Sequence, residues 1–588
     1  MVGRYGGPPP SKKLKTSSNN GYQANSSGSV CLGHGRLLSL NRSITPPLSR
    51  NQQPRKPGSP SGPGLPSRQK IIPSPIQLTH IRDISDSTGY NEGCVKLRDI
   101  LGDPMIKECW QFNYLFDVDY IMGQFDRDVK DLIQLKIIHG SWKKEAPNRI
   151  AIDDACKRYP NAEAVVAYMP EPFGTHHSKM MILIRHDNLA QIIIHTANMI
   201  PRDWGNMTQA VWRSPLLPLS QAQVCDTCGG FGSSARFKRD LLAYLEAYHN
   251  KTINTLIRQL QRYDFGSVKA VLIASVPTRL PVKELDSNRR TLWGWPALKD
   301  AIGSIPIDRS SSRAQNPHII VQVSSIATLG QTDRWLKETF LSSLYPQPEV
   351  NQNRSTSNVK FSIIFPTPDE IRRSLDGYGS GGSIHMKIQS PSQQKQLAYL
   401  RRYLCHWAGD AEGRKNSDPT TKSDRVREAG RRRAAPHIKT YIRFSDSDMN
   451  NIDWAMITSA NLSTQAWGAG ANTHGEVRIC SWEIGVLIWP DLFREEHIEG
   501  CSDSSLTNHV KMIPCFKRNT PSEKPLQSSE NDSTKVTLHS DATNMTRVGL
   551  RMPYDLPLIP YTPQEVPWCA TAVHQEPDWM GQTWEESD

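Results

Sequence analysis

The chain lacks the features that would place it in a membrane or hold it together with disulfides. Its apolar runs fall well short of the roughly 20 residues of a membrane-spanning helix, and its polar first residues lack a signal-peptide stretch. Its 11 cysteines are scattered and odd in number, which argues against a disulfide framework. Cys225 and Cys228 have CxxC spacing without a second pair at zinc-site spacing, so we interpret them as neighbouring loop thiols. These absences predict a soluble, intracellular protein without a metal or cofactor.

Positive charge is in excess. The 588 residues include 70 Lys and Arg against 58 Asp and Glu, a net charge of +12. This surplus favours a polyanionic partner such as nucleic acid, or an anionic membrane surface. The length is sufficient for two to four domains.

Residues 1–78 are rich in Ser, Pro, Gly, Asn and basic residues and poor in apolar ones. Such a segment buries too little surface to offset its ordering entropy, so we expect a disordered basic tail. Within it, Lys12-Lys13-Leu14-Lys15 fits either a nuclear localisation signal or a solvated basic patch. We expect the protein to be nuclear.

From about Ile81 onward, strand-like apolar runs alternate with helical patterns. The apolar runs include 165–168, 180–184, 192–194, 270–273, 319–321, 361–365 and 484–489, and helical spacing occurs over 241–248 and 397–407. The alternation predicts an α/β fold with sheets covered on both faces. Residues 408–433 and 517–546 are predicted to be mobile insertions. The first ends in Arg431-Arg432-Arg433, which could collect a phosphate backbone or simply be solvated.

A short pattern occurs twice, far apart in the chain. The first copy has His177-Ser178-Lys179, an apolar run, Thr196-Ala197-Asn198 and then Trp204-Gly205. The second has His437-Ile438-Lys439, an apolar run, Ser459-Ala460-Asn461 and then Trp467-Gly468, with the same spacing from Asn to Trp-Gly. Either copy alone would indicate a surface His-x-Lys, but the coincidence indicates a duplicated half-site. The two tryptophans are predicted to be packing residues.

The repeated residue types suit phosphate chemistry. Residues two apart on a strand point to the same face, so the His and Lys of each copy project together. Two lysines and two asparagines would form a cage for a phosphodiester that gains charge in a five-coordinate state. One histidine could attack phosphorus, while the other protonates the leaving oxygen and then activates water. His176 is predicted to face away, and the second copy has Pro436 there, so only His177 has a repeat partner.

These residues resemble the phospholipase D superfamily, whose members combine two His-x-Lys half-sites. The usual Asp five residues after the Lys is replaced by Ile184 and Phe444, and both copies carry the later Asn. With this departure the chain is identified as a member of the tyrosyl-DNA phosphodiesterase family, of the eukaryotic, 3′-specific kind. The similar stretches are Phe173–Met181, Pro436–Tyr441, Ser459–Ser463 and Pro553–Pro557, within about residues 80–580. The resemblance implies two similar mixed α/β domains, 79–268 and 269–588, with the active site at their interface.

The resemblance also implies roles. It makes His177 the nucleophile and His437 the general acid and base, with Gln209 supporting His437 and Glu483 supporting His177. Glu483 would favour the cation that His177 becomes during attack, whereas neutral Gln209 leaves the acidity of His437 less suppressed. The phosphate-binding groups implied are Lys179, Lys439, Asn198 and Asn461.

A second set of residues is implied to bind DNA. Phe173 resembles a residue near the bound strand that could pack against a base. Hydroxyls and backbone N–H groups contact phosphates without reading sequence. The residues implied in this way are Ser324, Ser325, Ile326, Ala327, Thr328, Ser459 and Ser463.

The resemblance therefore implies a metal-independent DNA-repair phosphodiesterase. It would hydrolyse the bond between a DNA 3′ phosphate and a tyrosine of a stalled topoisomerase I, leaving a 3′ phosphate, and would act on other 3′ blocking adducts. The expected partners are single-stranded or nicked DNA 3′ ends, with no membrane, and the expected state is a monomer. Two alternatives stand beside it: a phospholipase D-type lipid hydrolase or transferase, and a non-catalytic scaffold that binds DNA ends.

Overall fold

The structure is a computed structural model that describes residues 70–220, 229–282, 287–288, 290–307, 316–346, 359–408, 426–495, 509–522 and 545–585. The predicted tail up to residue 69, the pair Cys225 and Cys228, and most of both predicted insertions lie outside the described residues. Within the described part, none of the helices is both long and apolar enough to cross a membrane.

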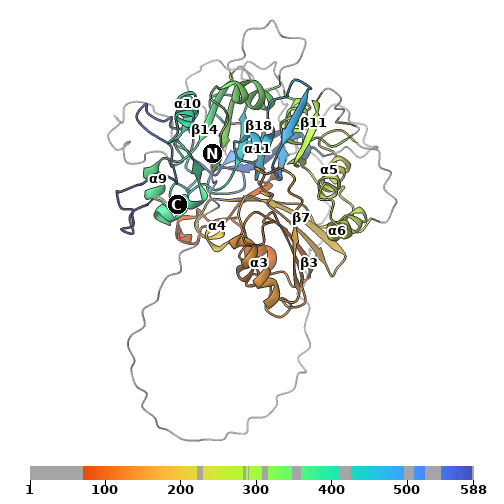
Figure 1. Cartoon of the computed structure of the whole chain (residues 1–588). Coiled ribbons are helices and arrows are strands. Elements are labelled where there is room, and N and C mark those ends of the chain that lie inside the picture. Colours follow the sequence, from red (N-terminus) through yellow and green to blue (C-terminus); the bar gives the residue numbers. More distant parts are fainter. Residues whose placement is uncertain are drawn as a thin grey trace, which may run out of the picture. The chain divides into compact units, whose positions relative to one another are not determined.

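The residues of the first half-site flank strands of an eight-stranded sheet, which is drawn mainly in orange in Figure 1. The strand order is β2-β8-β7-β6-β3-β4-β5, with β9 paired to β7. Strand β6 begins directly after Lys179 and forms an antiparallel hairpin with β7, which leads to Asn198. The bounds are β2 Ile76–Leu78, β3 Ile106–Phe112, β4 Gln134–His139, β5 Ala162–Val166, β6 Met180–Arg185, β7 Leu189–His195, β8 Ala210–Arg213 and β9 Leu217–Pro218.

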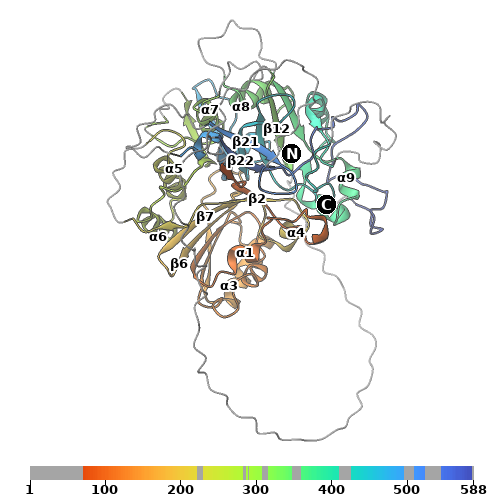
Figure 2. The same cartoon turned by 180° about the vertical axis from the view of Figure 1, so that it is seen from behind.

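The residues of the second half-site flank strands of a ten-stranded sheet that repeats this arrangement. Its path is β1-β22-β21-β18-β17-β12-β14-β16, and β20 pairs with both β18 and β10; Figure 2 shows β12, β21 and β22. Strand β17 begins directly after Lys439 and pairs antiparallel with β18, which leads to Asn461. The bounds are β1 Lys70–Ile72, β10 Val271–Ser275, β12 His318–Gln322, β14 Lys360–Ile364, β16 Leu404–Cys405, β17 Thr440–Phe444, β18 Ile452–Thr458, β20 Glu483–Ile488, β21 His509–Cys515 and β22 Met545–Arg551.

Two short strand pairs and the helices complete the described fold. Helix α3 packs against β5, while α5 and α7 pack against β10. The strand pairs are β11 Thr278–Pro281 with β19 Glu476–Ile479, and β13 Ser325–Ile326 with β15 His385–Met386. The α-helices are α1 Leu97–Leu101, α2 Val118–Met122, α3 Pro147–Arg158, α4 Pro201–Gly205, α5 Ser234–Glu246, α6 Lys251–Gln261, α7 Gly294–Gly303, α8 Ser342–Leu344, α9 Pro368–Arg372, α10 Pro391–Leu400 and α11 Thr464–Trp467. The predicted α/β fold class is confirmed.

Both faces of the half-site hairpins are buried. Met180 and Ile182 of β6 belong to a core cluster that also contains Ile442 and Ile484 of the second sheet, whereas Met181 packs in a separate cluster. This follows from the alternation of side chains along a strand. Each fully buried apolar side chain contributes about 1.5–3 kcal/mol, so the shared cluster holds the two hairpins firmly together.

Two predicted boundaries are wrong. Residues 70–72 and 76–78, assigned to the tail, form β1 and β2, which pair with β22 and β8. The helical pattern 397–407 breaks after α10, because Leu404 and Cys405 form β16 beside β14. Tertiary pairing thus overrides the local periodicity.

The end of the first predicted insertion is also wrong. Arg431 is buried, and its guanidinium donates to the carbonyl oxygens of Thr79 (2.9 Å) and Tyr90 (3.2 Å). Arg432 pairs with Asp555 at 2.6 Å. These two arginines therefore anchor the segment that leads to His437, since each binds a distant part of the chain.

Candidate active site

The two half-sites meet at one cavity of about 370 Å³. Residues from both sheets line it, including both repeat histidines. The lining residues are Tyr114, Leu115, Phe173, Thr175, His177, Asn198, Ser324, Ser325, Ala327, Gly382, Ser383, His385, His437, Asn461, Ser463, Gln465, Ser481 and Glu483.

The two halves exchange backbone hydrogen bonds on either side of this cavity. The His177 N–H donates to the Trp482 carbonyl (3.0 Å), and the His437 N–H donates to the Thr208 carbonyl (3.2 Å). Trp482 immediately precedes Glu483 at the start of β20, and Thr208 precedes Gln209, which stands just before β8. Each half therefore brings the segment that enters β8 or β20 beside the histidine of the other half.

The support of His177 is a carboxylate. Glu483 Oε2 lies 3.0 Å from His177 Nδ1. Ser459 accepts the Ile484 N–H at 2.9 Å, and its hydroxyl donates to Glu483 at 2.5 Å. Because a carboxylate only accepts hydrogen bonds, the proton of neutral His177 sits on Nδ1. Its Nε2 then carries a free electron pair.

The support of His437 has the opposite polarity. Thr196 accepts the Ala210 N–H (2.9 Å), so its own hydroxyl proton goes to Gln209 Oε1 (2.7 Å). The Gln209 amide nitrogen consequently faces His437 Nδ1 at 3.0 Å and donates to it. With this amide as the donor, the proton of neutral His437 sits on Nε2, and Asp203 Oδ2, which lies 3.2 Å from the same Nδ1, accepts the hydrogen bond of a second proton when His437 is charged. The two imidazoles are prepared for opposite tasks, one as a nucleophile and one as a proton donor.

The two repeat lysines lie behind the cavity wall. Both are fully buried, and their ammonium groups donate to the backbone carbonyls of His177 and His437. Burial lowers the pKa of Lys179 to about 8. Burial, together with the charge of Lys179, lowers the pKa of Lys439 well below its usual range. An arriving phosphate would reverse these shifts, since a nearby anion favours the charged lysine.

The repeat asparagines both line the cavity. Asn461 Oδ1 accepts the N–H groups of Ser324 (3.1 Å) and Ser325 (2.9 Å). Its amide nitrogen is therefore the end left to donate to a ligand. Asn198 is held through its backbone N–H, which donates to Asp203 at 2.7 Å.

The histidines are neutral in the free protein. Burial lowers the pKa of His177 to about 4, against the opposing pull of Glu483. Burial and the charge of Lys439 hold the pKa of His437 well below its ordinary value. His176 lies outside this arrangement, because its ring bonds the Asn113 carbonyl and the Tyr248 hydroxyl in the core.

Comparisons with known proteins agree with this geometry. The sequence profile of the tyrosyl-DNA phosphodiesterase family matches residues 75–562. The chain belongs to the tyrosyl-DNA phosphodiesterase family. It is 28% identical to a probable tyrosyl-DNA phosphodiesterase of Schizosaccharomyces pombe (88% of this chain, 96% of that one). It is also 28% identical to tyrosyl-DNA phosphodiesterase 1 of Arabidopsis thaliana (87% of this chain, 77% of that one).

A solved structure shows the same fold. The crystal structure of the yeast tyrosyl-DNA phosphodiesterase aligns with a TM-score of 0.56 at 20% identity, covering 84% of this chain and 99% of the other. The family resemblance predicted from the motifs is confirmed, and with it a hydrolase that acts on phosphodiester bonds in DNA repair.

Two members of the predicted DNA-binding set have buried side chains. Ser459 is fully buried, and its hydroxyl donates to Glu483. The side chain of Ile326 packs in the core. Phe173 is 70% exposed at the cavity edge, where Ser324, Ser325, Ala327 and Ser463 also lie, and Thr328 is exposed outside the lining.

Sequence reasoning missed Asp203. This fully buried carboxyl lies 3.2 Å from His437 Nδ1, and burial raises its pKa. It stands two residues before Gly205 in the repeat, but the second copy has Ala466 at the matching position. A comparison of the two copies could not reveal Asp203, because the residue is not repeated. Tyr114, edge-on to His177 at 5.7 Å between ring centroids, was also missed, as were Thr175, Gln465 and Ser481.

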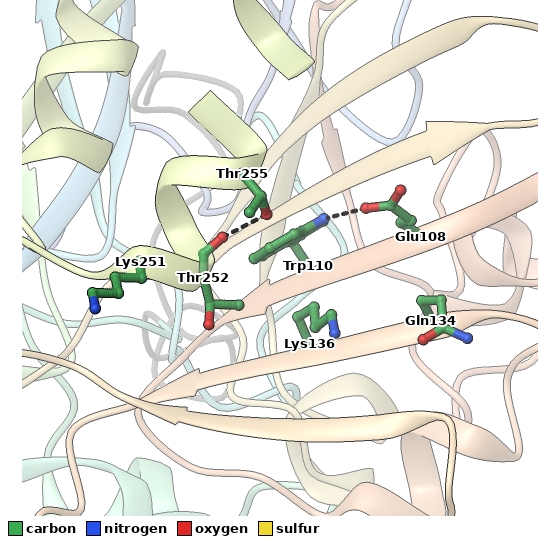
Figure 3. Close-up of a pocket in the computed structure, with 7 residues that line it drawn as sticks. All are labelled: Glu108, Trp110, Gln134, Lys136, Lys251, Thr252 and Thr255. Carbon is green, nitrogen blue, oxygen red and sulfur yellow. Dashed lines mark hydrogen bonds between the residues drawn. The ribbon is translucent and has the colours of Figure 1, made fainter. Parts of the chain in front are cut away.

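A second pocket of about 440 Å³ lies between β3, β4 and α6 (Figure 3). Two of its charged side chains already have partners: Lys136 contacts Glu163 at 2.6 Å, and Glu108 accepts from Trp110 at 3.1 Å. We therefore assign no ligand to it. The described residues contain no group of three His, Cys, Asp or Glu side chains arranged to hold a metal ion.

Proposed function

We propose that the enzyme hydrolyses the bond between a DNA 3′ phosphate and a tyrosine left by a stalled topoisomerase I. The product is a 3′ phosphate, and other 3′ blocking adducts are further substrates, because the cage holds the phosphate while the attached group varies. Family membership favours this DNA chemistry over the phospholipase alternative. The observation that carries the proposal is the opposite hydrogen-bond polarity at the two imidazoles.

In the first step, His177 Nε2 attacks phosphorus. The new N–P bond makes the imidazole cationic, and Glu483 stabilises that cation across 3.0 Å. His437 first takes up a proton from solvent at Nδ1, where Asp203 and Gln209 Oε1 accept the hydrogen bond, and it keeps this proton through both steps. It then delivers its Nε2 proton to the tyrosyl oxygen as the P–O bond breaks.

In the second step, His437 reverses its role. Its deprotonated Nε2 takes a proton from water, and the resulting hydroxide attacks phosphorus as the N–P bond breaks. The electron pair returns to His177, which leaves the site ready for another cycle. Lys179, Lys439, Asn198 and Asn461 stabilise the charge on the phosphoryl oxygens in both steps. We assign no metal to the reaction, because the lysines supply the positive charge.

The test is an oligonucleotide with a 3′ phosphotyrosine, incubated with the purified full chain in EDTA. Release of tyrosine and formation of a 3′-phosphate end are expected, with His177→Ala as the inactive control. If no tyrosine is released, the result would favour the alternative of a non-catalytic scaffold that binds DNA ends. Release only after a divalent metal is added would contradict the mechanism.

The proposal extends to the location of the protein, its oligomeric state and the form of its DNA substrate. We propose a nuclear protein that acts as a monomer, since one chain supplies both half-sites. We propose that the substrate ends are single-stranded or nicked and that Phe173 stacks on a base near the cleaved phosphate, which its exposed ring supports.

A further inference from the structure

A third imidazole lines the active-site cavity. His385 begins β15, which pairs with β13, and its N–H donates to the Ser324 carbonyl at 2.9 Å. Ser324 in turn holds Asn461 through its own N–H. The backbone of His385 is therefore anchored to a segment that positions one of the phosphate-binding groups.

The ring of His385 is free, unlike those of the other two cavity histidines. His177 and His437 are each tied at Nδ1 to a partner from the opposite half. Across the part of the chain that the structure describes, no side chain hydrogen-bonds to the imidazole of His385. The residue is exposed through the cavity mouth, so both ring nitrogens are available to a ligand.

The backbone places this ring on the His437 side of the cavity, because the His385 N–H bonds the Ser324 carbonyl and the Ser324 N–H bonds Asn461 of the second half. In agreement with this position, His385 is one of the groups that lower the pKa of His437, after burial, Lys439, Lys179 and His177. The neighbouring wall residues Gly382 and Ser383 are small, which leaves room beside the imidazole.

The geometry of the reaction indicates which part of the substrate lies near His385. In an in-line displacement, the attacking and leaving atoms lie on opposite sides of phosphorus. With His177 attacking and His437 protonating the leaving oxygen, a ring beside His437 faces the departing group. An imidazole can donate to a phenolic oxygen and can pack against an aromatic ring.

We propose that His385 contacts the aromatic group bonded to the 3′ phosphate and sets the preference of the enzyme for tyrosyl adducts over small 3′ blocking groups. This inference rests on the proposed function of the same cavity. It adds a specificity-determining residue to the site, and this residue lies on β15, which is not part of either copy of the repeat.

The test compares His385→Ala with the unchanged enzyme on two oligonucleotides, one ending in 3′ phosphotyrosine and one in 3′ phosphoglycolate. Loss of one hydrogen bond and ring contact should lower kcat/KM for the tyrosyl substrate about tenfold, and change the glycolate value less than about twofold. His385→Asn, which keeps an N–H donor, should recover part of the loss. His474→Ala removes an exposed imidazole outside the cavity and should match the unchanged enzyme.

Two results would overturn the proposal. Equal losses on both substrates would show that His385 acts on the shared phosphate, and unchanged kinetics on both would show that it makes no productive contact. The melting temperature checks that each variant is folded. Failure of the unchanged enzyme to release tyrosine would instead refute the proposed function, so the two failures are distinguishable.

Discussion

Replacing Glu483 with Gln tests the division of labour between the halves. The substitution removes one negative charge and keeps the shape of the side chain. The other half shows that such a glutamine fits, because Gln209 occupies the matching place between Thr196 and His437. Glu483→Gln should therefore fold normally while losing the anion behind His177.

The size of the effect follows from burial and from the charge that develops. The Glu483 side chain is only 5% exposed, so water does not replace the lost interaction. A hydrogen bond to a charged group exceeds a neutral one by about 1–2 kcal/mol, which corresponds to an about 5- to 30-fold slower attack. His177 is already neutral at pH 7, since its pKa is about 4. The loss should therefore be the same at pH 6.5 and pH 8.

The assay is single-turnover release of tyrosine from a 3′-phosphotyrosyl oligonucleotide, measured by rapid quench at both pH values. Glu476→Gln, which removes a carboxylate outside the cavity, serves as the matched control. A Glu483→Gln rate within twofold of the unchanged enzyme, with an unchanged melting temperature, would refute the reasoning.

Three further predictions concern other groups. Burial alone would lower the pKa of His406, but Glu370 and Glu565 outweigh it and raise the pKa to about 9. Their stabilisation, about 3 kcal/mol, is complete below pH 6.5 and lost as the pH rises through 9, so His406→Gln should flatten the fall in melting temperature between pH 7 and 10. Arg431→Met leaves the Thr79 carbonyl without this donor, while the Tyr90 carbonyl keeps Arg551, and it should lower the free energy of unfolding by about 1–3 kcal/mol in urea titrations. Asp203→Asn should slow hydrolysis of the covalent intermediate about tenfold, so that the adduct appears on denaturing gels during steady turnover.

The sequence was most informative where a pattern repeats. The two His-x-Lys units are predicted to lie on strands and project together; the structure places them just before equivalent hairpins, with the histidines in the cavity lining and the lysines behind it. The supporting residues could be predicted only through the family resemblance. Glu483 lies 306 positions from His177, and Gln209 lies 228 positions from His437. The spacing of residues along the sequence cannot predict these contacts, because each one joins residues from opposite halves of the protein.

The errors have physical causes of the same kind. Ser459 resembles a surface hydroxyl in sequence, yet it occupies the buried place that Thr196 has in the first half. Arg431 belongs to a charged run that is typical of a solvated loop, but backbone carbonyls from distant segments accept hydrogen bonds from both of its terminal nitrogens. Asp203 was hidden because only one half has it. In each case tertiary contacts decide which groups are buried.

The central claim is that one histidine attacks and the other releases. Its most direct test incubates His177→Ala and His437→Asn separately with a 3′-phosphotyrosyl oligonucleotide, and then identifies any covalent protein–DNA species by peptide mass spectrometry. The account predicts an acid-labile adduct at His177 in His437→Asn and none in His177→Ala. An adduct at His437 in His177→Ala, with none in His437→Asn, would contradict it.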